Sequence, residues 1–565
     1  MKHHLKALKW VYSILTLSTL ISCNDRNSAP TKELIDQMNL KRGNIISCGE
    51  SDNEFGTVDF EMTCDMKSKN DFNQAIELLH SFEYDESEKV FAKIIYENPK
   101  CSMAYWGIAM CNFHALWTPP TETELKKGSQ AVKIAQMVTG KSKRESAYIN
   151  AMAVFYKDWN KTDYRTRCIN YEKAMEKIHQ EYPDDKEAAI FYALALDVTA
   201  LPSDKSFANQ KKAGSILSSL YTKEPNHPGI IHYIIHTYDY PGLANSALAA
   251  ARRYAMVAPS SAHALHMPSH IFTRLGLWDE SIKSNLASIA SAKCYAEQAG
   301  FKGHWDEELH GLDYLVYAYL QKGENDLAQE QLKYLETINE VYPTNFKVAY
   351  AFAAIPSRIY LENKDWKGAA NVELIPSNFP WVRFPWQEAI VHFARIMGAA
   401  HLGNGILAES ELTKLKQLHD TLEKQKDFYK SNQVAIQIKS AEAWMNFMSG
   451  KKQAALNEMK VAAEMEDSTE KHPVTPGEVL PAREMLGDML FEDKQYENAL
   501  QSYEAVLQKS PNRFNSLYGA GRAEEKLGNR QKASFYYNQL LAICDSTNSN
   551  RPELGSIRAF LTVRQ

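Results

Sequence analysis

Apolar and polar residues alternate along most of this 565-residue chain with the period of an α-helix. From about Lys69 onward, apolar residues recur at steps of three and four, and turn signals interrupt them roughly every 12 to 20 residues. This pattern predicts many short helices in succession and therefore an all-α fold. The preceding stretch, 41–68, lacks the helical period, and its sequence SCGESDNEFGTVDFEMTC predicts an irregular segment with some strand character.

The clearest internal repeat lies near the C-terminus, where small and aromatic residues return after about 34 residues. The matching positions are Gly487, Ala499 and Tyr503 in one copy and Gly521, Ala533 and Tyr537 in the next. Small residues let two helices approach closely, the aromatic residue packs on the next pair, and Pro511 ends a helix. This pattern resembles the tetratricopeptide repeat (TPR), which implies a right-handed solenoid of helix-turn-helix units.

Looser copies of the same pattern extend the resemblance through most of the chain. Gly323 followed by Ala328, and Gly403 followed by Ala408, repeat the turn and the close helix crossing. Stretches such as AYWGIAM and HALHMPSHIF also resemble large bacterial TPR proteins, a resemblance that implies no particular reaction. The predicted organisation is a signal peptide at 1–22, a polar tether at 23–40, an irregular segment at 41–68, degenerate repeats at 69–480 with a histidine-rich groove at 228–320, two well-formed repeats at 481–545 and a C-terminal cap at 546–565.

The N-terminal sequence MKHHLKALKWVYSILTLSTLISC combines a basic start with an apolar run from Trp10 to Ile21. The run is too short for a relaxed membrane span, which needs ~18 apolar residues or more, and it fits the core of a signal peptide. Its ending, LISC, resembles the lipobox of bacterial lipoproteins, which implies cleavage before Cys23 and lipidation of its sulfur. A plain signal peptide or an uncleaved anchor helix are the alternatives. We expect an exported protein that contacts the membrane only through this lipid, on the periplasmic or the surface side.

Composition and charge exclude some partners and leave others open. Hydrophobic residues make up 44% of the chain and charged residues 24%, as in an ordinary folded protein. A net charge of -5 gives no reason to expect nucleic acid as a partner. Repeat solenoids expose an extended concave surface, so a protein or peptide partner is expected.

The chain contains eight cysteines, of which Cys23 is the predicted lipid attachment site. Cys48 and Cys64 lie in the irregular segment and can pair with each other in an oxidising compartment. We interpret the other five as scattered buried thiols: Cys101, Cys111, Cys168, Cys294 and Cys544. Because no CxxC motif occurs, a thiol-redox centre or a zinc ribbon is not predicted.

Histidines are concentrated in the middle of the chain, where six of the 17 fall between residues 227 and 270. The TPR resemblance implies that the second, fifth, ninth and twelfth residues of the first helix of each repeat line the concave groove. Such positions share one helix face, and neighbouring first helices lie side by side. In three consecutive repeats, those positions hold His232, His236 and Asp239, then His263, His266 and His270, then His310, Asp313 and Tyr317.

Three interpretations of these side chains compete. Imidazoles and carboxylates converging from adjacent helices suit zinc, iron or copper, with Asp239 or Glu307 orienting the rings. The same groups can instead bind a peptide, an anion or a small ligand, or they can be structural and bond to neighbouring carbonyls. His304, just before its helix, and Arg358 in the following repeat are further candidates for the groove. His227 is interpreted as a loop residue outside it.

No other motif points to chemistry, since the chain lacks a GxSxG nucleophile elbow, an HExxH helix and a glycine-rich phosphate loop. The first hypothesis is a cell-envelope lipoprotein that acts as a binding or scaffold protein and holds a metal ion or ligand in its histidine-lined groove. The second is a metal-dependent, hydrolase-like enzyme in which Asp239, Asp313 or Glu307 is the base. The third is a pure protein-interaction scaffold with structural histidines.

Overall fold

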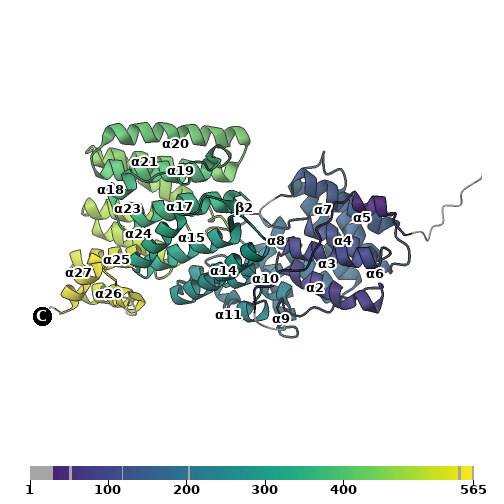
Figure 1. Cartoon of the computed structure of the whole chain (residues 1–565). Helices are drawn as coiled ribbons and strands as arrows, with labels where there is room; N and C mark the ends of the chain where they lie inside the picture. Colours follow the sequence, from purple (N-terminus) through teal and green to yellow (C-terminus); the bar gives the residue numbers. More distant parts are fainter. Residues whose placement is uncertain (1–28, 50–53, 117–118, 202–203, 545–548, 563–565) are drawn as a thin grey trace, which may run out of the picture.

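A computed structural model describes residues 29–49, 54–116, 119–201, 204–544 and 549–562. The predicted signal peptide and the lipidation site Cys23 lie outside these residues. Within them, no helix is both long and apolar enough to cross a membrane. Helices follow one another from one end of an elongated molecule to the other, and the chain ends at the tip formed by the last repeats (Figure 1). The predicted fold class, an all-α solenoid of TPR-like helix pairs, is confirmed.

Helix pairs in antiparallel contact build the N-terminal part of the solenoid. Two of their helices start at capping boxes, Thr121 with Glu124 and Ser142 with Glu145, which satisfy free backbone amides at the helix ends. A short helix α1 (Lys32–Asp36) and two 3-10 turns, η1 (Met66–Ser68) and η2 (Ala244–Ala247), accompany the pairs. The pairs are α2 (Lys69–His80) with α3 (Tyr84–Glu97), α4 (Ser102–Cys111) with α5 (Glu122–Met137), α6 (Lys143–Tyr156) with α7 (Tyr164–Glu181), α8 (Lys186–Thr199) with α9 (Ala208–Tyr221), and α10 (Pro228–Thr237) with α11 (Leu248–Val257).

The central pairs contain one interrupted helix. Pro268 has no amide hydrogen to donate, so the first helix of its pair is divided into α12 (Ala262–His266) and α13 (Pro268–Leu275). Gly276 then ends α13 with a φ of 65°, as the predicted turn requires. The remaining central elements are α14 (Trp278–Gln298), β1 (His304–Trp305), α15 (Asp306–Gln321), α16 (Asn325–Leu335), β2 (Val341–Tyr342), which pairs in parallel with β1, α17 (Phe346–Glu362) and α18 (Trp366–Ala370).

The C-terminal pairs show why the 34-residue pattern requires small residues. A β-carbon on Gly487 would lie 2.8 Å from the ring of Tyr503, and one on Gly521 would lie 2.4 Å from the ring of Tyr537. The helices therefore approach as closely as the repeat pattern predicts. After the 3-10 turn η3 (Trp381–Arg383), these elements are α19 (Pro385–His401), α20 (Gly405–Gln425), α21 (Phe428–Met448), α22 (Lys452–Asp467), α23 (Ala482–Glu492), α24 (Tyr496–Lys509), α25 (Phe514–Lys526), α26 (Arg530–Cys544) and the cap α27 (Pro552–Thr562).

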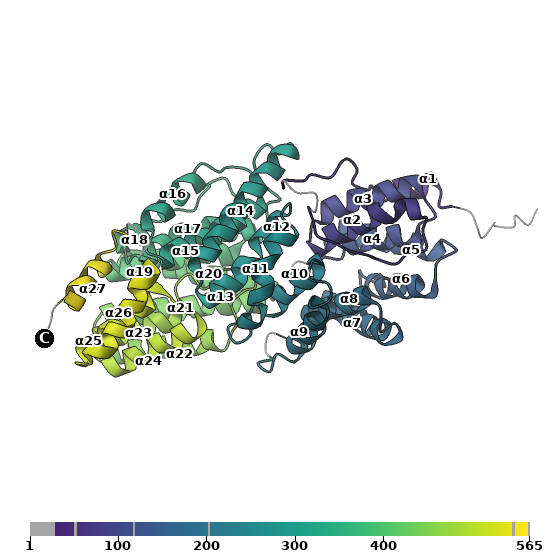
Figure 2. The same cartoon turned by 90° about the horizontal axis from the view of Figure 1, so that it is seen from below.

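The solenoid closes on itself at two places, which the two perpendicular views help to follow (Figures 1 and 2). In the N-terminal half, α10 packs on α2, and the imidazole of His232 bonds to the backbone carbonyl of His80. In the C-terminal half, α25 packs on α15, and buried Arg513 lies 3.3 Å from the hydroxyl of Tyr317. The concave side is therefore enclosed to a greater extent than an open superhelix would allow.

The predicted disulfide between Cys48 and Cys64 is wrong. Cys48 is bonded to Cys294 on α14, and Cys64 is bonded to Cys101 at the start of α4. The described parts of segment 41–65 run without helix and contact both the first repeats and the central ones, so its two cysteines meet different helices rather than each other. Cys101 and Cys294 are consequently not free thiols. The end of the predicted tether is also packed, because Met38 and Leu40 are buried in the core.

Candidate metal centre

Six histidines come together on three neighbouring helices of the solenoid. They come from α10, from the interrupted helix α12–α13, and from α15, the first helices of three successive pairs. The break at Pro268 does not separate His266 from His270, which keep the four-residue spacing that places two side chains on one helix face. The six residues form two groups, named here triad one (His232, His236 and His263) and triad two (His266, His270 and His310).

In triad one, the Nε2 atoms of two histidines face the Nε2 atom of the third. The Nε2 atom of His232 lies 2.8 Å from Nε2 of His236 and 3.1 Å from Nε2 of His263. Nδ1 of His232 donates to the carbonyl oxygen of His80 at 2.6 Å, because a carbonyl only accepts. The neutral ring of His232 therefore carries its lone pair on Nε2, and that lone pair faces two other imidazole nitrogens.

In triad two, the tautomers of two histidines are fixed from outside. Nδ1 of His266 donates to Oδ1 of Asn285 at 2.7 Å, and the amide of Asn285 is itself oriented by its donation to the carbonyl of Ser281. Nδ1 of His270 donates to the carboxylate of Asp239 at 3.0 Å. Both rings therefore carry lone pairs on their Nε2 atoms, which lie 3.1 Å apart. Two lone pairs at this distance repel each other unless a cation lies between them.

The third member of triad two completes a three-nitrogen arrangement. The ring of His310 lies 4.1 Å from the ring of His266, centroid to centroid, and 6.2 Å from that of His270. In each triad, one nitrogen from each ring lies within 4.8 Å of the other two. Two imidazole nitrogens on one tetrahedral zinc ion are about 3.3 Å apart, since each bond is ~2.0–2.1 Å. The observed spacing fits three ligands of one ion.

Burial keeps five of the six rings neutral, which is the form that binds a metal. Burial, followed by the neighbouring histidines, holds the pKa of His232, His236, His266 and His310 well below the ordinary value of 6.5. Burial also lowers the pKa of His270, although Asp239 opposes it. A proton shared between two rings is therefore disfavoured at neutral pH, whereas a metal ion needs the free lone pairs.

Two carboxylates flank the triads. Burial alone would raise the pKa of Asp239, but Lys471, Arg274 and His270 together hold it below its usual range. Asp239 is therefore ionised and accepts from His270, an arrangement that orients metal-binding imidazoles in many proteins. Glu307 lies beside triad one, with Oε2 3.7 Å from Nδ1 of His263, and Lys347 holds the pKa of Glu307 well below its usual range against the effect of burial.

A third cluster, formed by His80, Glu187 and His227, differs from the triads because all of its ring nitrogens have hydrogen-bond partners of the opposite kind. The two carboxylate oxygens of Glu187 each accept from one ring at 2.9 Å. The remaining ring nitrogens bond to the hydroxyl of Tyr233 and to the backbone amide of Ile230. Every ring nitrogen has a partner of the opposite kind, so this cluster is a structural network. As predicted, His227 lies just before its helix and outside both triads, and its buried ring caps the start of α10.

Four predicted groove residues lie away from the triads. Asp313 forms a buried ion pair with Arg358, because the next repeat supplies that guanidinium on α17. Tyr317 lies near Arg513 instead, and His304 bonds to Glu308 at 2.8 Å with its side chain 30% exposed. The interpretation of Asp313, Tyr317 and His304 as part of the histidine site is therefore not supported by their positions.

Several residues that contact the triad histidines, or the carboxylate of Asp239, were not predicted from the sequence. The carbonyl of His80, the amide of Asn285, the hydroxyl of Tyr314 and the ammonium of Lys471 all contact triad residues or their carboxylate. Asn285 lies on α14 and Tyr314 on α15, next to helices that carry the triads. His80 and Lys471 come from remote parts of the chain, and nothing in the local sequence points to them.

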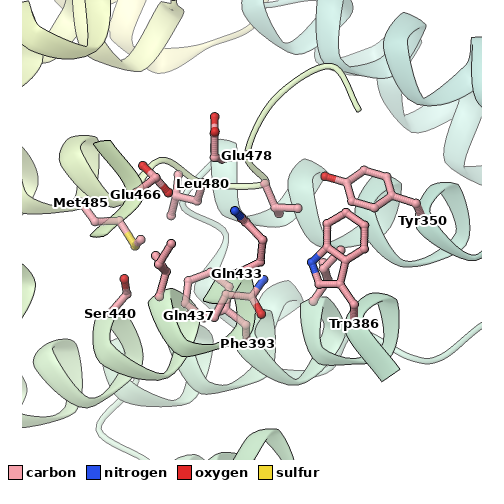
Figure 3. A pocket seen from close by; sticks show the side chains of 13 residues that line it. Tyr350, Trp386, Phe393, Gln433, Gln437, Ser440, Glu466, Glu478, Leu480 and Met485 are labelled. Carbon is pink, nitrogen blue, oxygen red and sulfur yellow. The ribbon is translucent and has the colours of Figure 1, made fainter. Parts of the chain in front are cut away.

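The concave side of the C-terminal half is occupied by a loop of the chain itself. Segment 468–481 lies there, and its Gly477 carbonyl accepts from Tyr350 at 3.2 Å and from Arg358 at 3.3 Å. A pocket remains between this loop and α19 and α21, and Gln433, Gln437, Trp386 and Glu466 are among the side chains that line it (Figure 3). Its cavity of about 40 Å³ has room for a few water molecules, far less than the ~300 Å³ of a usual ligand pocket.

The fold and the two triads define the class of protein: a TPR-like helix-pair solenoid with a buried histidine centre. Comparison with known proteins gives no family model and no curated protein that matches the chain. Among solved structures, the human IFIT1 dimer with m7Gppp-AAAA matches over 82% of this chain and 94% of its own, at 11% identity and a TM-score of 0.34.

Two further structural matches are of the same kind. The TPR domain of P58(IPK) matches over 67% of this chain and 98% of its own, at 14% identity and a TM-score of 0.20. The Cut9-Hcn1 hetero-tetramer of the APC/C matches over 87% and 96%, at 12% identity and a TM-score of 0.25. These values are too low to add to what the helix pairs of this chain show by themselves.

Proposed function

We propose that this protein is a cell-envelope lipoprotein that binds a transition-metal ion at its histidine triads. One observation carries the proposal: the Nε2 atoms of His266 and His270 face each other at 3.1 Å with both Nδ1 atoms engaged as donors. Imidazole nitrogens suit zinc, copper, iron and nickel. A cation between the two rings removes the repulsion of their lone pairs and uses the tautomers that the surroundings impose.

Other features support a metal ion over a peptide ligand in this groove. The triads are enclosed, with His232 and His266 completely buried, so a peptide cannot lie across them. The loop 468–481 covers the concave face further along. A protein partner, which repeat solenoids usually have, would dock on the outer surface.

Export and lipid anchoring are part of the proposal and rest on the sequence. The ending LISC and the polar tract after Cys23 support them. The two disulfides, Cys48–Cys294 and Cys64–Cys101, are of the kind that persists in an oxidising compartment. Intact mass of the chain from the membrane fraction tests this directly: a lipid-modified chain that starts at Cys23 is expected, and an unmodified chain would contradict it.

Metal content tests the central part of the proposal. The full chain is purified without a polyhistidine tag and analysed for all transition metals after dialysis. We expect at least one ion per chain, and none in the double variant His232→Ala/His266→Ala. The variant His304→Ala is the matched control, since His304 lies outside both triads and should leave the content unchanged. The proposal would be refuted if the wild-type chain contained only trace metal, even after reloading with zinc or copper, and if the double variant contained the same amount.

A metal-dependent hydrolase is the second candidate, and Glu307 is the observation that favours it. Its Oε2 atom is buried, lacks a hydrogen-bond partner among the described residues, and lies beside His263. An ionised carboxylate in this place can accept a proton. A hydrolase panel with the metal-loaded chain and with Glu307→Gln separates the candidates: activity lost in the variant supports catalysis, and silence of both supports binding alone.

A further inference from the structure

The two triads are built in the same way, one repeat apart. In each, a pair of histidines four residues apart on one helix is joined by the first histidine of the next repeat. The pair His232 and His236 is joined by His263, and the pair His266 and His270 is joined by His310. The second triad repeats the first at the same repeat positions, as a structural duplication would.

Each triad has its own orienting contacts outside the rings. The carbonyl of His80 fixes the tautomer of His232 in triad one. Asn285 and Asp239 fix those of His266 and His270 in triad two. Neither triad borrows a ligand atom from the other, so each can hold an ion independently.

The triads are also close neighbours. The rings of His236 and His270, one from each triad, are 6.4 Å apart and stand nearly perpendicular. His263 and His266 are less than one turn apart on α12. Two ions, one per triad, would be separated by no more than the ~8–10 Å between adjacent helices.

The charges around the triads limit which ions can fill both. All six ligands are imidazoles, which bring no negative charge to a metal ion, and the two flanking carboxylates already have cationic partners. Asp239 pairs with Arg274 at 2.8 Å and lies 3.4 Å from Lys471, and Glu307 pairs with Lys347. These two carboxylates, the ones placed beside the triads among the described residues, therefore offset little of the repulsion between two ions, and this repulsion is four times smaller for two monovalent ions than for two divalent ones.

From the duplicated geometry and this charge balance, we infer that the protein holds a pair of copper(I) ions, one in each triad. The inference rests on the proposed metal-binding function and goes further by stating the number, the arrangement and the charge of the ions. At ~8 Å and an effective dielectric constant of ~20, the second ion should bind on the order of 30-fold more weakly than the first. Imidazole nitrogens bind copper as well as zinc, iron and nickel, and a monovalent ion needs no anionic ligand to balance its charge.

Anaerobic titration of the full chain with Cu(I), in competition with a chromophoric chelator, tests the inference. We expect two ions per wild-type chain and one ion in each single-triad variant, His232→Ala and His266→Ala. The variants His236→Ala and His310→Ala repeat the test with residues nearer the edge, in case a central variant does not fold. His304→Ala should keep both ions.

The possible failures are distinct. A single ion in the wild-type chain, lost in variants of either triad, would overturn the paired centre and leave the proposed function in place. Two Zn(II) ions bound with no affinity for Cu(I) would overturn the assignment to copper(I). No binding of any metal would overturn the inference together with the proposed function.

Discussion

The carboxylate of Asp239 offers a sharp test of how triad two is organised. It accepts from Nδ1 of His270 at 3.0 Å and pairs with Arg274 at 2.8 Å and Lys471 at 3.4 Å. In the variant Asp239→Asn, the amide has one acceptor oxygen for three donors and adds two donors of its own. His270 then loses the acceptor that fixes its Nε2 lone pair towards His266.

Two effects of known size follow from this substitution. Loss of a contact that orients a metal ligand usually lowers the affinity about 10- to 100-fold, which is about 1.4–2.7 kcal/mol. Leaving Arg274 and Lys471 without their carboxylate also lowers the free energy of unfolding, by about 3–5 kcal/mol. A control must therefore separate the loss of affinity from the loss of stability.

The chain provides such a control in Asp313. Its ion pair with Arg358 is at least as buried, and neither residue hydrogen-bonds to a histidine of the triads. Affinity is measured by chelator competition on protein shown to be folded by circular dichroism, and stability by urea denaturation. We expect Asp313→Asn to lose stability and keep its metal affinity, and Asp239→Asn to lose both. Equal affinities in the two variants would refute the orienting role of Asp239.

The remaining predictions concern pH, the disulfides and the closure of the solenoid. Burial holds the pKa of His232, His236, His266 and His310 below 6.5, so at acidic pH the unfolded chain binds protons that the folded chain cannot. As the pH falls below about 6.5, each of these histidines should therefore lower the free energy of unfolding of the metal-free protein by up to ~1.4 kcal/mol per pH unit. A urea midpoint that stays constant between about pH 5.5 and 7.5 would contradict this. Peptide mapping without reduction should find Cys48 linked to Cys294 and Cys64 linked to Cys101, and a Cys48–Cys64 peptide would contradict this pairing. Opening the bond that spans 37 residues, by Cys64→Ser with Cys101→Ser, should cost about 4 kcal/mol in urea denaturation. Arg513 bonds to Glu362 at 2.6 Å and to Glu484 at 2.7 Å. The variant Arg513→Met should therefore lower the free energy of unfolding by about 3–5 kcal/mol. A change below about 1 kcal/mol would show that the packing of α25 on α15 contributes little to stability.

The fold was predictable because its signals are local. A 34-residue repeat with Gly487 against Tyr503 specifies a close helix crossing within one pair, and Gly276 specifies a turn within a few residues. The same register predicted that the histidines of α10, α12–α13 and α15 face one side, since it depends only on neighbouring repeats.

What the sequence did not predict arises from contacts between remote segments. The disulfide partners depend on the path of a segment without helical period, which no spacing rule describes. Asp313 has the groove position that the register predicts, but its carboxylate forms an ion pair with Arg358 of the next repeat instead of contacting the histidines. His80 reaches triad one only because α10 packs back on α2, 152 residues away in the sequence.

The most direct test of the central claim is to locate metal ions in crystals of the protein by anomalous scattering at the copper and zinc absorption edges. We expect one peak between the Nε2 atoms of His266 and His270, near His310, and a second between the rings of His232, His236 and His263. Crystals soaked in copper or zinc that show no anomalous density at either triad, with the imidazoles bonded directly to one another, would contradict it.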